Sequence, residues 1–576
     1  MRPASLLCVL VLAKVCALVG RDVPASVWSP IAYLWQDLLL VAIIAAFDLA
    51  TRRHSWVGWS LYAVVVVYAA ANVPVARVLG TPLTRPMLRA AGAPLTDSIG
   101  HYATFTNLAL PVLVLFAAVG LPWVFRRVRP RQSAIGVLAL VPLIALGPLA
   151  VSRVETLGAH RNAVVALVVS QFPRVGTGDS REPVPDSSVP TTTPDPLARF
   201  RGAAANRHVV LVLLESTAAQ YLKPYGAAED PMPNLTGFAG QGMLFEDVYV
   251  AYPDSIKALF TLLFSRYPAL DTTPEQCETI ATPSIAAVLR GQGYRTALFH
   301  SGRFKYLGME SVIRNRGYEV LEDAGDIGWN RNSSFGIEEG PTVRRLLSWV
   351  DGLPRSERFF VTYVPIAGHH PYETPKPGPF RECQEIDCYR NALHYADSAL
   401  GELVAGLQSR GLDRETLFVF VGDHGQAFNQ HPRNVGHNLF IYEENVRVPF
   451  VITAPGLITE GVRLPGLTSH VDVVPTMLDL LGATAPADYQ GLSRLAGKRA
   501  TVQFFTDCSL ALVGLREENW KYVHEIESNR HKLFDLAEDP GEQRNLADRH
   551  PERVDRYKAR LLEWCSTQRG LIVRPR

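Results

Sequence analysis

The sequence has almost no net charge, few cysteines and no internal repeats. Its 57 Lys and Arg residues against 55 Asp and Glu residues leave a formal charge of +2 over 576 residues. This balance lacks the basic excess by which nucleic-acid binders neutralise phosphates, so we expect no nucleic-acid partner. The seven cysteines include no CxxC pair, which argues against a cysteine-based zinc site.

Long apolar runs are concentrated in the first quarter of the chain. Five of them are long enough to consider as membrane spans: Ser5–Val19, Ile31–Ala50, Trp56–Val75, Phe105–Phe125 and Ala134–Val151. The first run is short and follows Arg2, so a signal peptide is the alternative interpretation. Because four further runs follow and no clear cleavage site does, we predict an uncleaved span.

Basic residues between these runs predict their orientation. Arg52 and Arg53 separate the second and third runs, and a basic group over residues 126–131 separates the fourth and fifth. Basic loops remain in the cytoplasm, so we expect a multi-pass protein of the cell (inner) membrane whose chain after Val151 lies outside. The expected parts are a transmembrane domain, a juxtamembrane linker and an extracytoplasmic catalytic domain, over residues 1–151, 152–207 and 208–576.

An extracytoplasmic location permits disulfides. Five cysteines would lie there, and because five is odd at least one is free or intermolecular. Short spacing favours a Cys383–Cys388 bridge, and Cys508–Cys565 is a weaker second prediction.

From His208 the chain alternates short buried strands with helices. Strands are predicted at residues 209–214, 242–252, 296–300, 359–364, 417–421 and 448–454, with helices over residues 256–264 and around 389–407. This rhythm is typical of a doubly wound α/β sheet, in which functional residues gather at the carboxyl ends of the strands.

Metal-binding side chains follow two of these strands. Asp423 and His424 come after the strand at 417–421, and Glu215 comes after the strand at 209–214. A carboxylate at the end of a central strand is costly unless it is paired or binds a metal. Carboxylate oxygens with a histidine nitrogen suit Zn²⁺ or Mn²⁺, so we predict one divalent ion. The alternative is a loop aspartate beside a surface histidine.

Ser255 precedes an apolar helix, at the position where a helix N-cap belongs. Serine there is most often only a cap. The functional alternative is a nucleophile, because the free N–H groups and the dipole of a helix N-terminus stabilise an alkoxide and the anion that it attacks.

Taken in order, motifs from about Val209 to Ala547 resemble the sulfatase branch of the alkaline phosphatase superfamily. The matching segments are Leu213–Thr217, Pro233–Leu235, Gly293–Thr296, His369–Tyr372, Gly422–Gln426, His437, Tyr442–Pro449, Asp472–Thr476, Trp520–Tyr522 and Leu533–Asn545. Within that branch, the arrangement of five spans followed by an outer catalytic domain is most similar to that of lipoteichoic acid synthases and phosphoethanolamine transferases. The resemblance therefore implies a helical membrane domain followed by an alkaline-phosphatase/sulfatase-like α/β domain.

The resemblance also implies substrates and a metal site. Those family members transfer a phospho-headgroup from a phospholipid to a second acceptor, so the expected partners are the lipid bilayer and a membrane phospholipid or an envelope glycan or lipid. Their single metal site uses a glutamate, a threonine nucleophile, an aspartate and a histidine. The matching positions here are Glu215, Ser255, Asp423 and His424.

Further residues match the part of the family site that holds the substrate. His369 and His437 match histidines that bind the phosphate, and His369 is expected to protonate the leaving group. His370, Lys257 and Arg303 are additional candidates for substrate binding. For Lys257 and Arg303, a solvated surface position is the alternative.

The sequence departs from true sulfatases at the nucleophile. Those enzymes oxidise a Cys or Ser in a C/S-x-P/A-x-R context to formylglycine. Ser255 lies at that register, thirteen residues before Pro268, but Lys257 and Leu259 replace the Pro or Ala and the Arg. We therefore predict a metal-dependent phosphotransferase or phosphodiesterase that acts through a covalent serine intermediate. A sulfuric ester hydrolase and a non-catalytic membrane lipid sensor with the same fold are the alternatives.

Overall fold

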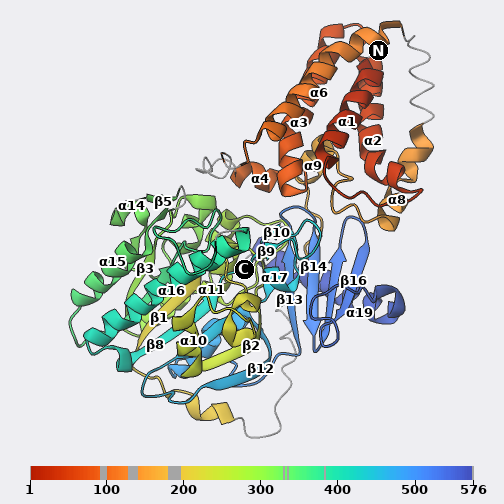
Figure 1. The fold of residues 1–576 in the computed structure, drawn as a ribbon. Coiled ribbons are helices and arrows are strands. Elements are labelled where there is room, and N and C mark those ends of the chain that lie inside the picture. The colour runs from red at the N-terminus through yellow and green to blue at the C-terminus, as the bar shows by residue number, and fades with distance from the viewer. Residues whose placement is uncertain are drawn as a thin grey trace. The chain divides into compact units, whose positions relative to one another are not determined.

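The computed structural model describes residues 2–90, 100, 102–127, 140–178, 196–328, 331–333, 336–381 and 384–573. By its internal contacts the chain divides into two compact units. The helical unit contains residues 1–173 with the short segments 508–510 and 526–530, and the sheet unit contains residues 174–507, 511–525 and 531–576. Figure 1 labels helices and strands of both units.

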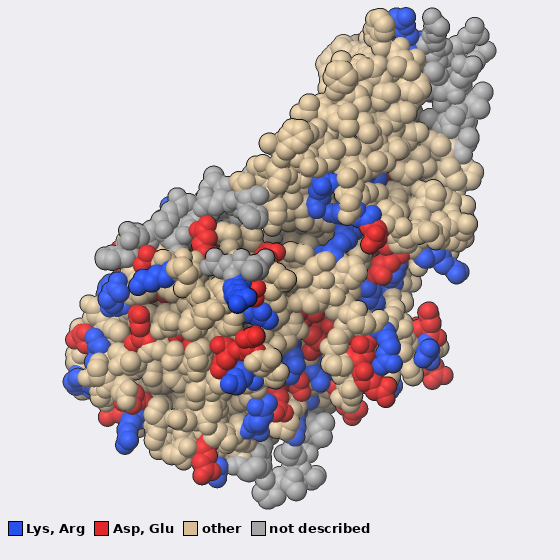
Figure 2. All heavy atoms as spheres, in the orientation of Figure 1, with Lys and Arg blue, Asp and Glu red and all other residues tan. Residues whose placement is uncertain are grey.

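The helical unit is built from apolar helices. Its helices are α1 (Arg2–Leu18), α2 (Ser29–Ala50), α3 (Ser55–Leu79), α4 (Arg85–Ala90), α6 (Phe105–Val124), α8 (Gly147–Arg153) and α9 (Ala163–Val169), with a 3₁₀ turn at Phe125–Arg127. Leu, Val and Ala side chains of α1, α2, α3 and α6 form its core. Helix α6 also exposes Phe105, Phe116 and Val119, and Figure 2 shows few charged side chains over this unit. An apolar exterior of this kind suits lipid contact.

The structure supports three of the five predicted spans by length and composition. Helices α2, α3 and α6 have 22, 25 and 20 residues and are apolar enough to cross a membrane. Helix α1 has 17 residues, fewer than the about 20 that a span requires. The predicted fifth span lies partly outside the described residues, and α8 covers only its last part.

The core of the sheet unit is an eight-stranded sheet in the order β12-β2-β11-β8-β1-β7-β3-β4. The strands are β1 (His208–Leu214), β2 (Met243–Tyr249), β3 (Arg295–His300), β4 (Val320–Glu322), β7 (Phe359–Val364), β8 (Thr416–Gly422), β11 (Phe450–Thr453) and β12 (Val462–Ser469). Only β11 runs against its neighbours within this sheet. All residues of β1, β7 and β8 are buried, as expected for central strands covered on both faces.

Helices cover the sheet. The main ones are α10 (Pro233–Gly240), α11 (Ser255–Phe264), α12 (Ile285–Gly291), α15 (Glu339–Asp351), α16 (Glu385–Ser409) and α18 (Val473–Leu480), and short ones are α13 (Glu310–Ile313), α14 (Ala324–Ile327) and α17 (Glu443–Val446). Leu235, Leu346 and Leu403 of α10, α15 and α16 share a buried core with Val210 and Val212 of β1. Figure 1 shows α15 and α16 running side by side on this face.

A second, antiparallel sheet follows in the chain. Its strands are β13 (Thr501–Thr506), β14 (Leu512–Glu517), β15 (Trp520–Glu525) and β16 (Arg530–Asp535), with α19 (Pro551–Val573) after them. Two small ribbons complete the set, β5 (Arg331–Ser333) with β6 (Gly336–Ile337) and β9 (Ala427–Phe428) with β10 (Val435–Gly436).

The structure excludes the second of the two predicted disulfides. Cys565 lies buried on α19 as a thiol, so the Cys508–Cys565 prediction is wrong. The apolar surroundings that bury Cys565 raise its pKa, which keeps the thiol protonated. Cys383 lies outside the described residues, so the Cys383–Cys388 pairing stays a prediction.

Candidate active site

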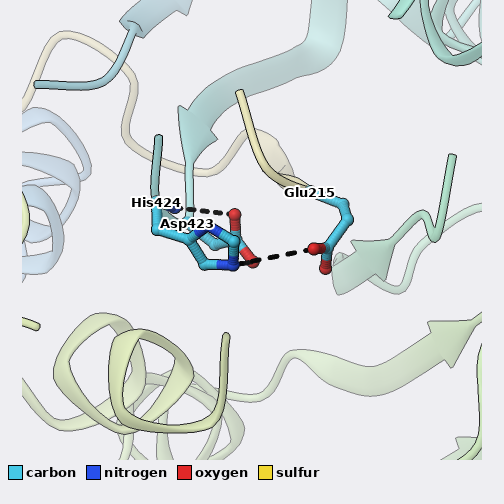
Figure 3. Close-up of side chains that lie close together, drawn as sticks. All are labelled: Glu215, Asp423 and His424. Atoms are coloured by element: carbon cyan, nitrogen blue, oxygen red, sulfur yellow. Dashed lines mark hydrogen bonds and ion pairs between the residues drawn. The ribbon is translucent and has the colours of Figure 1, made fainter. Parts of the chain in front are cut away.

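The register of the two central strands brings two distant carboxylates together. Strands β1 and β8 are parallel, and Leu214 pairs with Gly422 where both strands end. Glu215 directly follows β1 and Asp423 directly follows β8. The two residues therefore lie side by side at the carboxyl edge of the sheet. Figure 3 shows their side chains converging with that of His424. Ligand atoms of these three buried residues all lie within 4.8 Å of one another.

Backbone contacts fix the orientation of Asp423 and His424. One oxygen of Asp423, Oδ1, accepts hydrogen bonds from the backbone N–H groups of Ser216 (2.9 Å) and His424 (2.7 Å). Its other oxygen, Oδ2, lies 3.5 Å from His424 Nε2. His424 Nδ1 lies 2.9 Å from the carbonyl oxygen of Gly425, which orients Nε2 toward the carboxylates. Such an outer hydrogen bond is the usual support of a metal-binding histidine.

Ser255 joins this group from the first turn of α11. Its Oγ lies 3.1 Å from His424 Nε2 and 3.3 Å from Glu215 Oε2. The prediction that Ser255 is the N-cap is wrong, because the cap is Asp254, whose side chain accepts from the N–H groups of Ile256 and Lys257. Ser255 is the first helical residue, and its hydroxyl is directed to the carboxylate cluster.

The electrostatics of the group favour a cation. Burial and the neighbouring Asp423 raise the pKa of Glu215 to about 7. Burial likewise raises the pKa of Asp423 to about 7. Two buried carboxylates this close are costly when both are ionised, and a divalent ion between them offsets that cost. Two carboxylates, a histidine nitrogen and a hydroxyl therefore form a donor set that fits Zn²⁺ or Mn²⁺.

Two further predicted histidines lie beside the group. The ring of His437 stacks on that of His424 with 3.9 Å between the centroids. Burial and the nearby His424 and His369 lower the pKa of His437 well below its ordinary value, which keeps that imidazole neutral. His369 Nδ1 lies 2.6 Å from the carbonyl oxygen of His370, and the His370 ring packs edge-on against Tyr372.

Comparison with known families identifies the sheet unit. A family model described as Sulfatase matches residues 207–483, and one described as N-sulphoglucosamine sulphohydrolase, C-terminal, matches residues 437–564. Over residues 207–483, just under half of the chain, the protein matches the sulfatase family, and this part of the sheet unit is called the sulfatase domain. This confirms the family resemblance seen in the sequence.

Two kinds of curated relative match part of the chain. Arylsulfatase K of Mus musculus is 30% identical over 212 residues, which are 33% of this chain and 37% of that protein. The lipoteichoic acid synthase-like protein YvgJ of Bacillus subtilis is 24% identical over 322 residues, 52% of this chain and 51% of that protein. The chain thus spans about half or less of the length of these relatives.

Solved structures share the fold of the sulfatase domain. The lipoteichoic acid synthase LtaP from Listeria monocytogenes has a TM-score of 0.54 at 18% identity, covering 66% of this chain and 96% of that one. A 2-O GAG sulfatase has a TM-score of 0.53 at 18% identity, covering 64% and 93%. At this identity the likeness establishes the fold alone.

The two predicted basic residues of the sulfatase domain are engaged with acids. Lys257 Nζ lies 3.0 Å from Asp507 Oδ1 and sits over the ring of Tyr252. Arg303 lies 3.7 Å from Asp323, and 42% of its side chain is exposed. Contact of either residue with a substrate stays a prediction.

Two residues of the site had no clear signal in the sequence. Tyr306 follows β3 in a short 3₁₀ turn, and burial together with Asp254 and Glu215 raises its pKa. Its phenol therefore lies within the field of the carboxylates. Ser216, with a φ of +53°, donates a hydrogen bond from its hydroxyl to Glu215 Oε1 (2.8 Å). Neither residue type is distinctive in a loop, which is why sequence patterns alone do not single them out.

Proposed function

We propose that this membrane-anchored enzyme of the sulfatase superfamily transfers or hydrolyses a phospho-headgroup through a covalent intermediate on Ser255. The observation that carries the proposal is the position of the Ser255 hydroxyl, within 3.3 Å of both Glu215 and His424. A hydroxyl at a helix N-terminus, in contact with a metal-binding group, suits attack on phosphorus.

Glu215, Asp423, His424 and Ser255 would hold one Mn²⁺ or Zn²⁺. When bound, such an ion polarises phosphoryl oxygens and favours loss of the hydroxyl proton. The side chains of the site would orient the phosphate diester, exclude water and transfer protons.

The reaction would proceed in two displacements. Ser255 Oγ gives up its proton toward Glu215 and forms a bond to phosphorus, while the bond from phosphorus to the lipid alcohol breaks. His369 donates a proton to the departing alkoxide, and His437 binds the non-bridging oxygens. In the second displacement an acceptor hydroxyl or water gives its proton to His369 and forms a bond to phosphorus, while the bond from phosphorus to Ser255 Oγ breaks and Ser255 Oγ regains its proton from Glu215.

A sulfuric ester hydrolase is the second candidate function, because arylsulfatase K is among the relatives. Lys257 and Leu259 argue against it, since formylglycine formation requires Pro or Ala and Arg at those positions. A non-catalytic lipid sensor is the third candidate, but it has no need of a complete set of four metal-binding side chains.

The proposed substrates lie in the cell envelope. The likeness to lipoteichoic acid synthase-like YvgJ supports a membrane phospholipid donor and an envelope glycan or lipid acceptor. The basic groups at residues 52–53 and 126–131, together with a fifth span over Ala134–Val151, support a sheet unit outside the cytoplasm. His370, Lys257 and Arg303 remain proposed contacts of the headgroup.

The full chain in detergent tests these candidates directly. We expect turnover of bis(p-nitrophenyl) phosphate and none of p-nitrophenyl sulfate, and an intact serine in the Ser255 peptide by mass spectrometry. Asp423→Ala should lose the bound metal in elemental analysis. Turnover of the sulfate ester, or a Ser255 residue found as formylglycine, would overturn the phosphotransferase proposal in favour of the sulfatase.

A further inference from the structure

A small, partly open cavity lies in the helical unit, and its lining is mostly apolar with several polar side chains. Its volume is about 60 Å³, several times the roughly 10–15 Å³ that one water molecule requires. Side chains of α1, α2 and α3 and the residues before α9 line it. Its polar lining consists of Lys14, Arg21, Asp37, Asn72, Arg161 and Asn162. Ionisable groups inside an apolar helical bundle are costly and usually have a function.

The acid of the cavity is already neutralised. Asp37 Oδ2 lies 3.3 Å from Lys14 Nζ, and Asp37 Oδ1 accepts a hydrogen bond from Asn162 Nδ2 (2.6 Å). Lys14 also donates to the carbonyl oxygens of Ala159 and Arg161. The charges of Lys14 and Asp37 therefore cancel, and the net charge of the cavity depends on the arginines.

The arginines leave an excess of positive charge. Arg161 pairs with Glu527 at 2.5 Å. Arg21 donates to the carbonyl oxygens of Ala76 and Arg77. The neighbouring Arg77 donates to carbonyl oxygens and to the Asn107 amide oxygen, and within the described part of the chain neither Arg21 nor Arg77 forms an ion pair.

The cavity lies toward one end of the helical bundle, where Arg21 follows the last residues of α1. Lys14 lies four residues before the end of α1, about 6 Å along the helix axis. Asp37 lies eight residues after the start of α2, about 12 Å along its axis. The opposite end of the bundle is marked by the Arg2–Asp48 pair. The cavity thus lies within about two or three helical turns of one end.

We propose that this cavity binds the phosphate of an anionic phospholipid headgroup. Arg21, which forms no ion pair within the described residues, lines this cavity and can contact a phosphate, and the apolar flanks of α1 and α3 suit acyl chains. The role of the site rests on the proposed function, since the cavity would hold the lipid donor or its product in the membrane. Binding itself requires no turnover.

Lipid binding to the full chain in phosphatidylcholine nanodiscs tests the proposal. Phosphatidylglycerol is added in increasing fractions, and retained lipid is counted by native mass spectrometry. Arg21→Gln should weaken phosphatidylglycerol binding about tenfold, because the variant loses one charged hydrogen bond to the lipid phosphate. Ala17→Phe, which fills the cavity without changing charge, should weaken it as well.

The controls separate the cavity from general charge effects. Arg53→Gln makes the same change at an exposed residue beyond the other end of α2 and should leave binding unchanged. Equal losses in Arg21→Gln and Arg53→Gln, or no loss in Arg21→Gln and Ala17→Phe, would overturn the proposal. Equal competition by free glycerol phosphate would assign the cavity to a soluble anion instead.

The catalytic variant keeps the two proposals distinct. Ser255→Ala should retain phosphatidylglycerol binding, because Ser255 belongs to the sheet unit. Intact cavity binding with no phosphodiester turnover in the wild-type chain would contradict the proposed function alone. Turnover with no cavity binding would contradict the cavity proposal alone.

Discussion

Asp254 and Ser255 are adjacent in the chain, but their side chains have different roles. Asp254 caps α11, and Ser255 Oγ contacts Glu215 and His424. Ser255→Ala should therefore fold, keep much of its metal and lose several powers of ten in turnover, each worth about 1.4 kcal/mol of barrier. Ser255→Thr should retain part of the activity, because it keeps a hydroxyl.

The matched variant is Asp254→Ala. Loss of the cap should cost about 1 kcal/mol of stability and leave most of the turnover. Steady-state rates and melting temperatures of the full chain measure both effects. Wild-type turnover in Ser255→Ala would remove the nucleophile from the mechanism.

The raised pKa values of Glu215 and Asp423 predict a pH dependence of the metal-free protein. Between about pH 4.5 and 7 the folded chain keeps protons that the unfolded chain has lost, so stability falls as pH rises and levels off above pH 7. For Glu215 alone the shift corresponds to roughly 3 kcal/mol. Thermal melting of the metal-stripped chain at pH 5 and pH 8 measures this loss of stability.

Glu215→Gln supplies the control for this pH dependence. It removes one of the two titrating carboxyls, so the melting temperature should change less between pH 5 and pH 8. Added Mn²⁺ or Zn²⁺ should stabilise the wild-type chain most at pH 8, where both carboxylates are ionised. A pH dependence identical in both proteins would show that Glu215 titrates normally.

Residue patterns located the cluster of Glu215, Asp423 and His424 better than its surroundings. Continuous β-branched and Leu runs located β1 and β7, and the acids after the strand ends were evident. The cap could not be assigned, because Asp254 and Ser255 are both good N-cap residues and only the backbone decides between them. Tyr306 reaches the site through a turn whose geometry no local pattern specifies.

At the scale of elements, close backbone packing holds the loop after β7 against the end of β1. Gly368 has a φ of +111°, and a Cβ there would lie 2.4 Å from the carbonyl oxygen of Glu215. Gly368→Ala should therefore displace Glu215 and lower metal content and turnover together. Elemental analysis and steady-state rates of the purified chain measure the two effects.

Gly226 is the matched control for Gly368. Its φ is +100°, but no atom lies within 4 Å of a Cβ placed there. Gly226→Ala should carry only the cost of a left-handed backbone, about 1 kcal/mol, and keep its metal. Metal loss of equal size in both variants would mean that strain alone, without contact on Glu215, explains the effect.

Element types were predictable, whereas one strand direction and the number of spans were not. The strand predicted at 448–454 is β11, which runs antiparallel to its neighbours in the main sheet. Its direction could not be predicted, because a buried apolar run does not indicate whether a strand is parallel or antiparallel to its neighbours. Helix α1 is apolar but stops at Leu18, so length rather than composition separates it from α2, α3 and α6.

At the scale of the whole molecule, the orientation in the membrane can be tested by fusion. The basic groups at residues 52–53 and 126–131, together with a fifth span over Ala134–Val151, predict that the sheet unit lies outside. A reporter that is active only outside the cytoplasm should therefore work when fused after Arg201. Activity of a cytoplasm-dependent reporter at that point would contradict the predicted orientation.

The pairing of Leu214 with Gly422 has a consequence for biosynthesis. Glu215 emerges early during synthesis, but its partners Asp423 and His424 follow some two hundred residues later. No ribosome-bound chain shorter than that carries a complete ligand set. With the sheet unit outside, as we propose, the site closes only after most of the chain has been exported. The enzyme would then take its ion from the envelope, and the metal supply of that compartment, rather than that of the cytoplasm, would decide which ion it carries.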